Sequence, residues 1–324
     1  MHSLLARYAD CIFWMARYVE RAENLTRILD VTQSSARRHR GTKDWQAILE
    51  INSDLERYRD SGRAIDDEAI VRFYVLDGGN PTSILHALTC ARENARTLRP
   101  FISTEMWSQL NVAYNWLRTL DERNLAASER PQLLATIREH CQTHTGITEG
   151  TFFRDQGWYF YQLGRYIERA DQSTRLLDVK FHRVAADSPM SLIEAGEAAA
   201  ILRSAAGYHA FRRVHPRGFV LVDVVGFLLL DDAFPRSVSH CINETDRLLH
   251  ELRQRYGLRG GNRALERLDE IRVALFERPP AAILRAGLHE FVDWIQSQLI
   301  DISSAVAGDF FGRGDTAQAG AEAQ

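Results

Sequence analysis

Lysine is almost absent from this sequence of 324 residues, in which Lys43 and Lys180 are the only examples. Arginine therefore supplies nearly all of the positive charge, and its planar guanidinium suits bidentate contacts with carboxylate or phosphate groups. A GC-rich genome would produce the same bias. Forty basic against forty-three acidic residues leave a formal net charge of −3. This balance excludes a general attraction to nucleic acid or to anionic membranes, so any anion site must be local.

Closely spaced cysteines and long apolar runs are also missing. Cys11, Cys90, Cys141 and Cys241 form no CxxC pair, which argues against a zinc ribbon or a disulfide framework and favours reduced thiols. The most apolar segment, residues 219–230, contains an aspartate and is shorter than the roughly twenty residues of a membrane helix. The opening MHSLLARYAD does not resemble a signal peptide. We therefore expect a cytoplasmic protein without a membrane span.

Familiar catalytic and cofactor-binding motifs are absent as well. The sequence contains no GxxxxGK[ST], no GxGxxG between a strand and a helix, no GxSxG and no HExxH. In HCQTH, His140 and His144 are spaced to share a metal on one helix face, but no third ligand is evident nearby. The sequence therefore predicts neither a metal nor a cofactor.

What the sequence does contain is an internal repeat. ARYVERAENLTRILDV at residues 16–31 recurs as GRYIERADQSTRLLDV at residues 164–179, and ten of the fifteen positions from Arg17 to Val31 are identical in the second copy. Residues 71–88 resemble residues 225–242, with Pro81, Ser83 and His86 matching Pro235, Ser237 and His240. The tripeptide ERP also occurs at 129–131 and at 277–279. These matches indicate that the chain arose by duplication.

Apolar residues recur with a period of 3.6 throughout, which predicts an all-α fold. We expect a duplicated helical bundle, with two similar halves of about six helices packed with pseudo-twofold symmetry. The helices of the first half are expected near 3–38, 44–60, 65–76, 81–100, 103–121 and 130–144, with counterparts from 152 to about 307. The halves would span 1–148 and 149–311, and a short join near 145–151 would make them share one core. Residues 312–324 have the composition of a disordered tail.

The repeated motif has an apolar face and a polar face. On a helix, Ile12, Met15, Val19, Ala22 and Leu29 form an ordinary core stripe. A second strip carries arginine, glutamate, an amide and arginine in the same order in both copies. Its members are Arg17, Glu20, Asn24 and Arg27, repeated as Arg165, Glu168, Gln172 and Arg175. Because a merely solvated face would be free to change between copies, this agreement favours a specific partner for the strip.

Two kinds of partner fit the strips. In the structural interpretation, which we favour, the strips face each other and Glu20 and Glu168 accept bidentate hydrogen bonds from arginines, because buried charges must be paired. In the functional interpretation the strips line a cleft in which the arginines bind a carboxylate or phosphate. Glutamates with unpaired acceptors would favour the cleft, whereas fully bonded glutamates would favour the structural interpretation.

Two weaker candidates lie elsewhere in the sequence. His86 and His240 have the chemistry of a general base, although a packed histidine bonded to a neighbour is the more frequent arrangement. Arg92, Arg96 and Arg99 lie on adjacent helical turns and form a basic ridge without a full counterpart in the second half. Neighbouring acids such as Glu93 would neutralise this ridge, so a solvated face is expected there.

The motifs LLARYADCIFWMARYVERAENLTRILDV, NPTSILHALTCARENAR and GTFFRDQGWYFYQLGRYIERADQSTRLLDV resemble the bacterial alpha-E family, a domain of unknown function named for its helices and its ER motif. The match spans roughly residues 3–307, with Glu20-Arg21 and Glu168-Arg169 at the ER positions. Ala16 stands where the family often has glycine, as Gly164 does.

The resemblance implies a context more than a reaction. Alpha-E domains are typically encoded beside, or fused to, a circularly permuted ATP-grasp ligase and a transglutaminase-like protein, which are thought to make or modify peptides. The first expectation is thus a helical accessory or adaptor module that binds the ligase, its peptide substrate, or both. One alternative is an enzyme that uses Glu20 and Glu168 as acid and base, with His86 or His240 assisting and arginine clamps. Another is a small-molecule-binding helical bundle.

Overall fold

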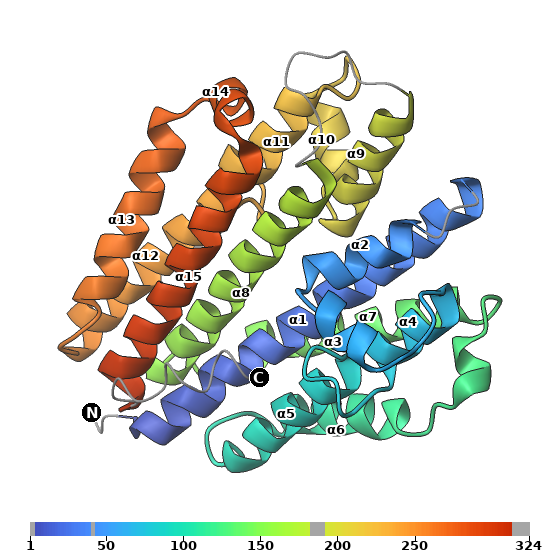
Figure 1. The fold of residues 1–324 in the computed structure, drawn as a ribbon. Coiled ribbons are helices and arrows are strands. Elements are labelled where there is room, and N and C mark those ends of the chain that lie inside the picture. Colours follow the sequence, from blue (N-terminus) through green and yellow to red (C-terminus); the bar gives the residue numbers. More distant parts are fainter. Residues whose placement is uncertain (1–3, 40–42, 182–191, 313–324) are drawn as a thin grey trace.

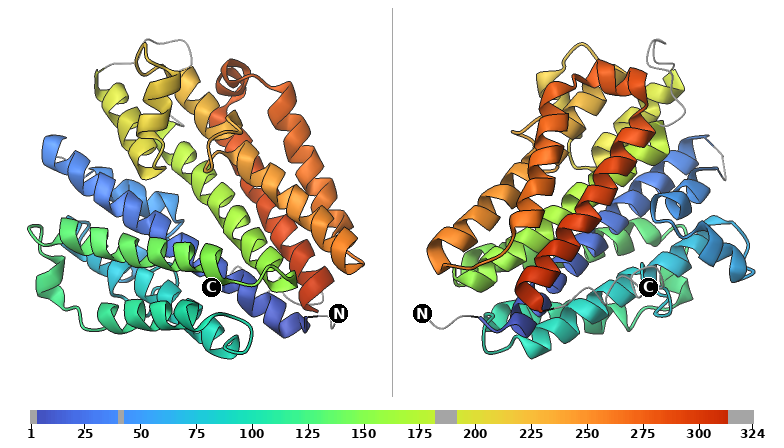
Figure 2. Two further views of the ribbon diagram at one scale, coloured as in Figure 1. Left: turned by 180° about the vertical axis from the view of Figure 1, so that it is seen from behind. Right: turned by 60° about the vertical axis from the view of Figure 1, so that its left-hand side comes forward.

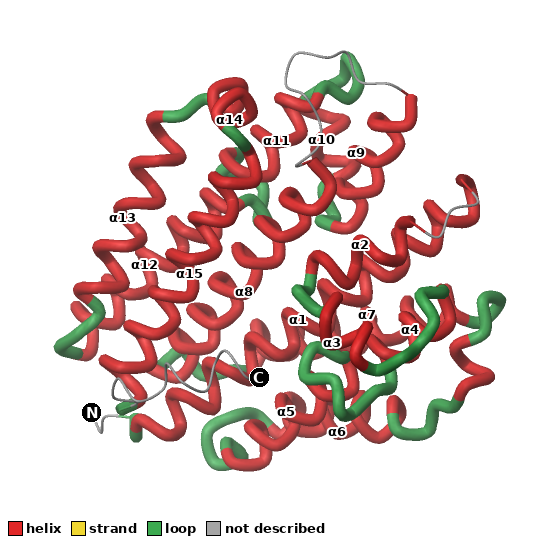
Figure 3. Tube along the Cα trace, viewed as in Figure 1, coloured by secondary structure: helices red, strands yellow, loops and turns green. Residues whose placement is uncertain are grey.

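The computed structural model describes residues 4–39, 43–181 and 192–312, and these residues form helices and connecting turns without a β-strand (Figures 1 and 3). This confirms the all-α prediction. The first run of elements is α1 (Ala6–His39), α2 (Lys43–Ile51), α3 (Leu55–Asp60), α4 (Asp67–Val75), α5 (Ile84–Thr97), α6 (Thr104–Leu117), η1 (Glu122–Leu125) and α7 (Arg130–Thr151). The second run is α8 (Gln156–Phe181), α9 (Leu192–Ser204), α10 (Tyr208–Val214), α11 (Leu221–Leu230), α12 (Val238–Tyr256), α13 (Asn262–Glu277), α14 (Pro280–Ala286) and α15 (Leu288–Phe311).

The two long helices α1 and α8 carry the repeated motif, and they cross at the centre of the molecule (Figures 1 and 2). Their backbones approach closely beside Gly164, where an added Cβ would lie 2.3 Å from the carbonyl oxygen of Phe13. Only glycine fits so close to a backbone atom. The buried stripe Ile12, Met15, Val19 and Leu29 enters this core as the periodicity predicts.

The other helices pack around this crossing in a comparable order. In the first run α1 packs against α5 and α7, and α5 and α7 both pack against α6. In the second run α8 packs against α12 and α15, and α12 and α15 both pack against α13. In addition, α2 contacts α8 and α9 contacts α1. Buried apolar residues from both runs therefore belong to one continuous core.

Several expected helix boundaries are wrong by three or more residues. The helix expected over 44–60 is interrupted after Ile51, where Ser53 has a φ of 57°. Non-glycine residues seldom adopt a positive φ, and a right-handed helix cannot continue through one. The buried carboxylate of Asp54 then accepts hydrogen bonds from Thr82 and Tyr74, which ties this break to the turn before α5. The break therefore has a tertiary cause.

The segment expected to join the two halves is helical. Residues 145–151 continue α7 as a helix to Thr151, so the expected boundary at 148/149 falls inside this helix and the turn to α8 is residues 152–155. The two ERP tripeptides open different elements, because the first precedes the long α7 and the second precedes the short α14. Gly287, with a φ of 118°, ends α14 and leads into α15. Apart from Gly312, the tail expected from 312 onward lies outside the described residues.

The repeated Pro-x-Ser-x-x-His sequence forms a helix start. Pro81 and Pro235 lie in the preceding turns rather than in the helices, which begin three residues later than expected. The hydroxyl of Ser83 accepts a hydrogen bond from the backbone N–H of His86, and Ser237 does the same for His240, both at 3.1 Å. Serine is among the preferred N-cap residues. Capping therefore accounts for the repeated serine.

No helix within the described ranges is long and apolar enough to cross a membrane. The apolar α11 spans only Leu221–Leu230 and is largely buried in the core of the protein. The cysteines of the described residues form no disulfide bond, and Cys141 and Cys241 are buried.

Candidate functional site

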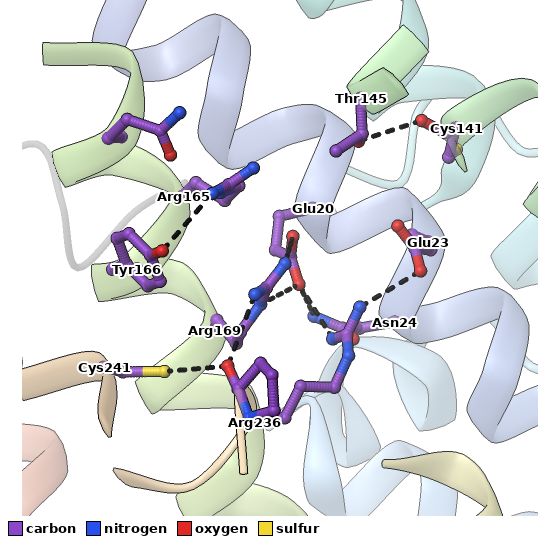
Figure 4. A network of polar contacts seen from close by, with 12 residues as sticks. Glu20, Glu23, Asn24, Cys141, Thr145, Arg165, Tyr166, Arg169, Arg236 and Cys241 are labelled. Atoms are coloured by element: carbon purple, nitrogen blue, oxygen red, sulfur yellow. Dashed lines mark hydrogen bonds and ion pairs between the residues drawn. The ribbon is translucent and has the colours of Figure 1, made fainter. Parts of the chain in front are cut away.

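The glutamate of the first ER motif, Glu20, is buried beneath the crossing of α1 and α8, with 2% of its surface exposed. Arg169, the arginine of the second ER motif, binds it in bidentate fashion, with Nε 2.9 Å from Oε1 and Nη2 2.8 Å from Oε2 (Figure 4). Arg236, from the turn before α12, adds a bond of 2.8 Å to Oε1. The amide of Asn24 donates to the same oxygen at 3.3 Å. Both carboxylate oxygens are thus bonded.

The glutamate of the second motif, Glu168, is fully buried and has a related set of partners. Arg21, the arginine of the first ER motif, donates from Nε to Oε1 at 2.7 Å and from Nη2 to Oε2 at 3.0 Å. Arg17 adds a bond of 2.8 Å to Oε2, and the amide of Gln172 lies 3.4 Å from Oε1. The two ER motifs are therefore joined by reciprocal ion pairs, because the arginine of each motif binds the glutamate of the other.

The electrostatics of these glutamates follow from their partners. Burial raises the pKa of the Glu168 carboxyl, but the nearby charges of Arg21 and Arg17 outweigh burial and lower this pKa to about 2. Burial likewise opposes ionisation of Glu20, and Arg169 and Arg236 hold its pKa well below the ordinary glutamate value. Both side chains are therefore carboxylates at neutral pH, with no proton to donate and no unbonded oxygen to accept one.

The remaining members of the strips lie around the two glutamates. Arg27 binds Glu23 on its own helix at 2.8 Å, and Arg175 binds Asp171 at the same distance. Arg165, which matches Arg17 in the repeat, does not bind Glu20. It donates instead to Glu149 at the end of α7, at 2.8 Å.

Sequence reasoning identified the glutamates but missed three of their arginine partners. Arg21 and Arg169 were assigned only to the ER motif, although their identity in both copies was a usable signal. Arg236 stands where the repeat has Thr82 in the first half, so the comparison of the halves gave no indication of its role. Besides Glu20, Arg236 binds Asn24 at 2.6 Å and Glu23 at 3.0 Å.

The histidines lie apart from these ion pairs. His86 is 3.3 Å from the sulfur of Cys90, and His240 contacts the backbone carbonyl of Asp232 at 2.8 Å. His144 is buried, and burial lowers its pKa to about 4, whereas His140 packs against Trp116. In the described ranges no group of three or more histidine, cysteine, aspartate or glutamate residues is arranged to hold a metal ion.

This arrangement is suited to joining α1 to α8 rather than to binding a ligand between them. A carboxylate with two arginine partners, buried and bonded at both oxygens, meets the condition that favours the structural interpretation of the strips. Two open grooves lie on either side of α13, and none of the ER-motif residues lines them.

Comparisons with known proteins agree with the sequence motifs. Residues 4–311 match the model of the Alpha-E family, described as a predicted alpha-helical domain with a conserved ER motif. Uncharacterized proteins of Mycobacterium bovis and Mycobacterium tuberculosis are 24% identical to the chain over 328 residues, covering 93% of it. The chain spans about a third, 36%, of the length of these relatives. No solved structure matches the chain.

Proposed function

Because the chain belongs to the Alpha-E family, we propose that it is a cytoplasmic accessory module of an ATP-grasp amide-ligase system. In this proposal it binds the circularly permuted ligase, the ligase's peptide substrate, or both. The transglutaminase-like protein of the same system is a further partner. The proposal rests on the resemblance for the identity of the partners and on the geometry for the kind of role.

The reciprocal ion pairs between the ER motifs are the observation that supports a non-catalytic role. Glu20 and Glu168 are the repeated acids with the greatest potential for acid–base chemistry, yet both are held as fully bonded carboxylates. An acid–base catalyst needs a pKa near the working pH and access to the substrate. These residues have neither property, so the geometry favours the accessory role over the enzyme alternative.

We also propose that the two runs of elements are duplicated halves related by a pseudo-twofold axis that passes between the ER motifs. The reciprocal pairs Arg21 with Glu168 and Arg169 with Glu20 support this relation. The matching packing of α1 with α5 and α7, and of α8 with α12 and α15, supports it as well. In this proposal the ion pairs of the ER motifs hold the two halves together, and the surfaces that bind partners lie on the exterior of the protein.

The experiment that tests the proposed function uses the tagged full-length chain from its native host. Affinity capture is carried out with and without ATP, and mass spectrometry identifies the proteins that co-purify. The ATP-grasp ligase is expected among them, and the purified ligase should then form a complex with the purified chain on size-exclusion chromatography. A ligase that neither co-purifies nor forms this complex would contradict the proposal.

A further inference from the structure

The outer face of α13 leaves two neighbouring large apolar side chains exposed, and one of them, Phe276, is the most exposed large apolar side chain in the described part of the chain. Phe276 is 92% exposed, and Val273, one helical turn earlier, is 52% exposed. Single exposed apolar residues are normal on a protein surface, but exposed apolar side chains that lie next to each other mark interaction sites. Figure 1 shows α13 at the edge of the molecule, and the right view of Figure 2 brings this side forward.

A groove runs along each side of α13. The first, between α13, α14 and α15, has a volume of about 820 Å³, and its floor includes Ile283, Phe291 and Trp294. The second, between α13, α11 and α12, has a similar volume of about 820 Å³ and includes Leu230 and Phe276. Val273 and Glu277 belong to both grooves. The helix α13 thus forms a ridge with a groove on either side, and each groove is lined by both apolar and charged residues.

The rim of the first groove is acidic. Glu266, Glu270, Glu277 and Glu290 line it, together with the single arginine Arg278. Arg267 binds Glu270 at 2.7 Å. None of the ion pairs in the described part of the chain involves Glu266, Glu277 or Glu290. The rim therefore has an excess of negative charge above an apolar floor that contains a tryptophan.

The corresponding face of the first half has the opposite character. On α6, arginines cover the aromatic rings, with the guanidinium of Arg92 4.8 Å from the centre of the Tyr114 ring and that of Arg99 5.5 Å from Trp107. Arg92 and Arg96 are also paired with Glu93. On that face the aromatic rings are covered by arginines of the same chain. On α13 the ring of Phe276 is 92% exposed, although in the first groove Arg278 lies 5.6 Å from the centre of the Phe291 ring.

We infer that the face of α13 is the docking surface for an amphipathic helix of the partner protein whose apolar stripe is flanked by arginine or lysine. The inference rests on the proposed function, because it specifies the surface used by that accessory module. An apolar helix face laid in a groove is a recurring mode of recognition, and side chains at i, i+3, i+4 and i+7 provide the anchors. Basic side chains beside such a stripe would meet Glu266, Glu277 and Glu290, and one of them would stack on Trp294.

The test measures binding of the purified circularly permuted ATP-grasp ligase to the full-length chain by biolayer interferometry. The double variant Val273→Ser with Phe276→Ser removes the apolar ridge, and Val112→Ser, which alters a residue of α6 that is 51% exposed, is the matched control. We expect the double variant to raise the dissociation constant by about tenfold or more. The control should change it by less than about twofold. Equal melting temperatures show that all of the proteins are folded.

A second variant tests the charge. Glu266→Gln, Glu277→Gln and Glu290→Gln together should slow association, and the wild-type complex should weaken as salt increases, because exposed charges are screened. Hydrogen–deuterium exchange on the ligase should protect a helical segment that contains arginine or lysine. A protected segment that is acidic or non-helical would overturn the assignment of the occupant.

The outcomes separate this inference from the proposed function. If the wild-type chain binds no ligase, the proposed function fails. If the wild-type chain binds and the double variant binds equally well, the docking surface is wrong while the proposed function stands. If the double variant loses only self-association, measured by sedimentation velocity, then a second copy of the chain occupies α13 and the inference is overturned.

Discussion

The two ER glutamates have the same motif around them but different sets of arginines. Glu168 is bound by Arg21 and Arg17, which both come from α1. Glu20 is bound by Arg169 from α8, but its second arginine, Arg236, comes from the turn before α12. The residue that matches Arg17 in the repeat, Arg165, binds Glu149 instead. The difference shows that what the two ER motifs share is the electrostatic requirement of a buried carboxylate, which residues from different elements can meet.

The largest effect is expected when either glutamate is neutralised. Glu168→Gln and Glu20→Gln keep the shape of the side chain but leave buried arginines without a partner, which should lower the free energy of unfolding by about 3–5 kcal/mol. The loss should be greater for Glu168→Gln, because after Glu20→Gln the side chain of Arg236 still binds Glu23. Urea denaturation measures both changes.

An exposed glutamate of α7, Glu139, provides the control, because Glu139→Gln alters the same functional group at the surface. Binding of the ligase per folded molecule should be unchanged in the two destabilised variants. Unchanged stability of Glu20→Gln and Glu168→Gln would contradict a structural role for the ER motif.

The second-largest effect is a loss of stability at low pH that is caused by one buried histidine. His144 on α7 is buried, whereas the described histidines of residues 192–312 are not. Burial lowers the pKa of His144 to about 4, against an unfolded value of about 6.5. Between these pH values the unfolded chain binds more protons, so stability is complete above about pH 6.5 and falls as the pH drops toward 4, by on the order of 3 kcal/mol.

The substitution His144→Leu should remove most of this dependence, as measured by melting temperature from pH 7 to pH 4. His209→Gln, at an exposed position, should leave the dependence in place. A pH profile of His144→Leu parallel to that of the wild-type protein would show that another group is responsible.

The third prediction compares arginines that occupy matching positions. Arg17→Met removes a bond to a fully buried carboxylate and should cost about 1.5–3 kcal/mol, the range for hydrogen bonds to charged groups. Arg165→Met removes a bond to Glu149, whose side chain is 38% exposed, and should cost less than about 1 kcal/mol. Arg236→Met should resemble Arg17→Met. Equal losses for Arg17→Met and Arg165→Met would mean that the partner's burial does not determine the effect.

The smallest effect is expected on the outer face of α13. Phe276→Ser should change the free energy of unfolding by less than about 0.5 kcal/mol, because the ring is 92% exposed and surface substitutions seldom exceed this value. Val112→Ser on α6 is again the control. A clear loss of stability in Phe276→Ser would show that the ring packs within the folded chain and is not held ready for a partner.

Much of the architecture could be predicted from the sequence, because apolar periodicity identifies long helices and the repeat identifies matching positions. The buried stripe of α1 and the bonded state of the glutamates both follow from elementary rules about burial. The break at Ser53 could not be predicted, since it depends on bonds from Tyr74 and Thr82 to Asp54. Such tertiary contacts override local helix propensity.

The membership of the ion-pair cluster was predictable only in part. A strip read along one helix gives the residues that share a face, but it does not give those that approach from another element. Arg236 is more than two hundred positions from Glu20, and its counterpart in the repeat is a threonine. The bare ridge of α13 was likewise hidden, because a single phenylalanine in a helical pattern resembles a core residue.

The reciprocal ER pairs also have a consequence for folding during synthesis on the ribosome. Arg21 is separated by 147 residues from Glu168, the carboxylate that neutralises it. At about 5–20 residues per second, roughly 7–30 s pass between the synthesis of these two side chains. During that interval the emerging first half has a glutamate and arginines that cannot yet be buried as pairs. The reciprocal ion pairs can therefore form only after the second motif has left the exit tunnel.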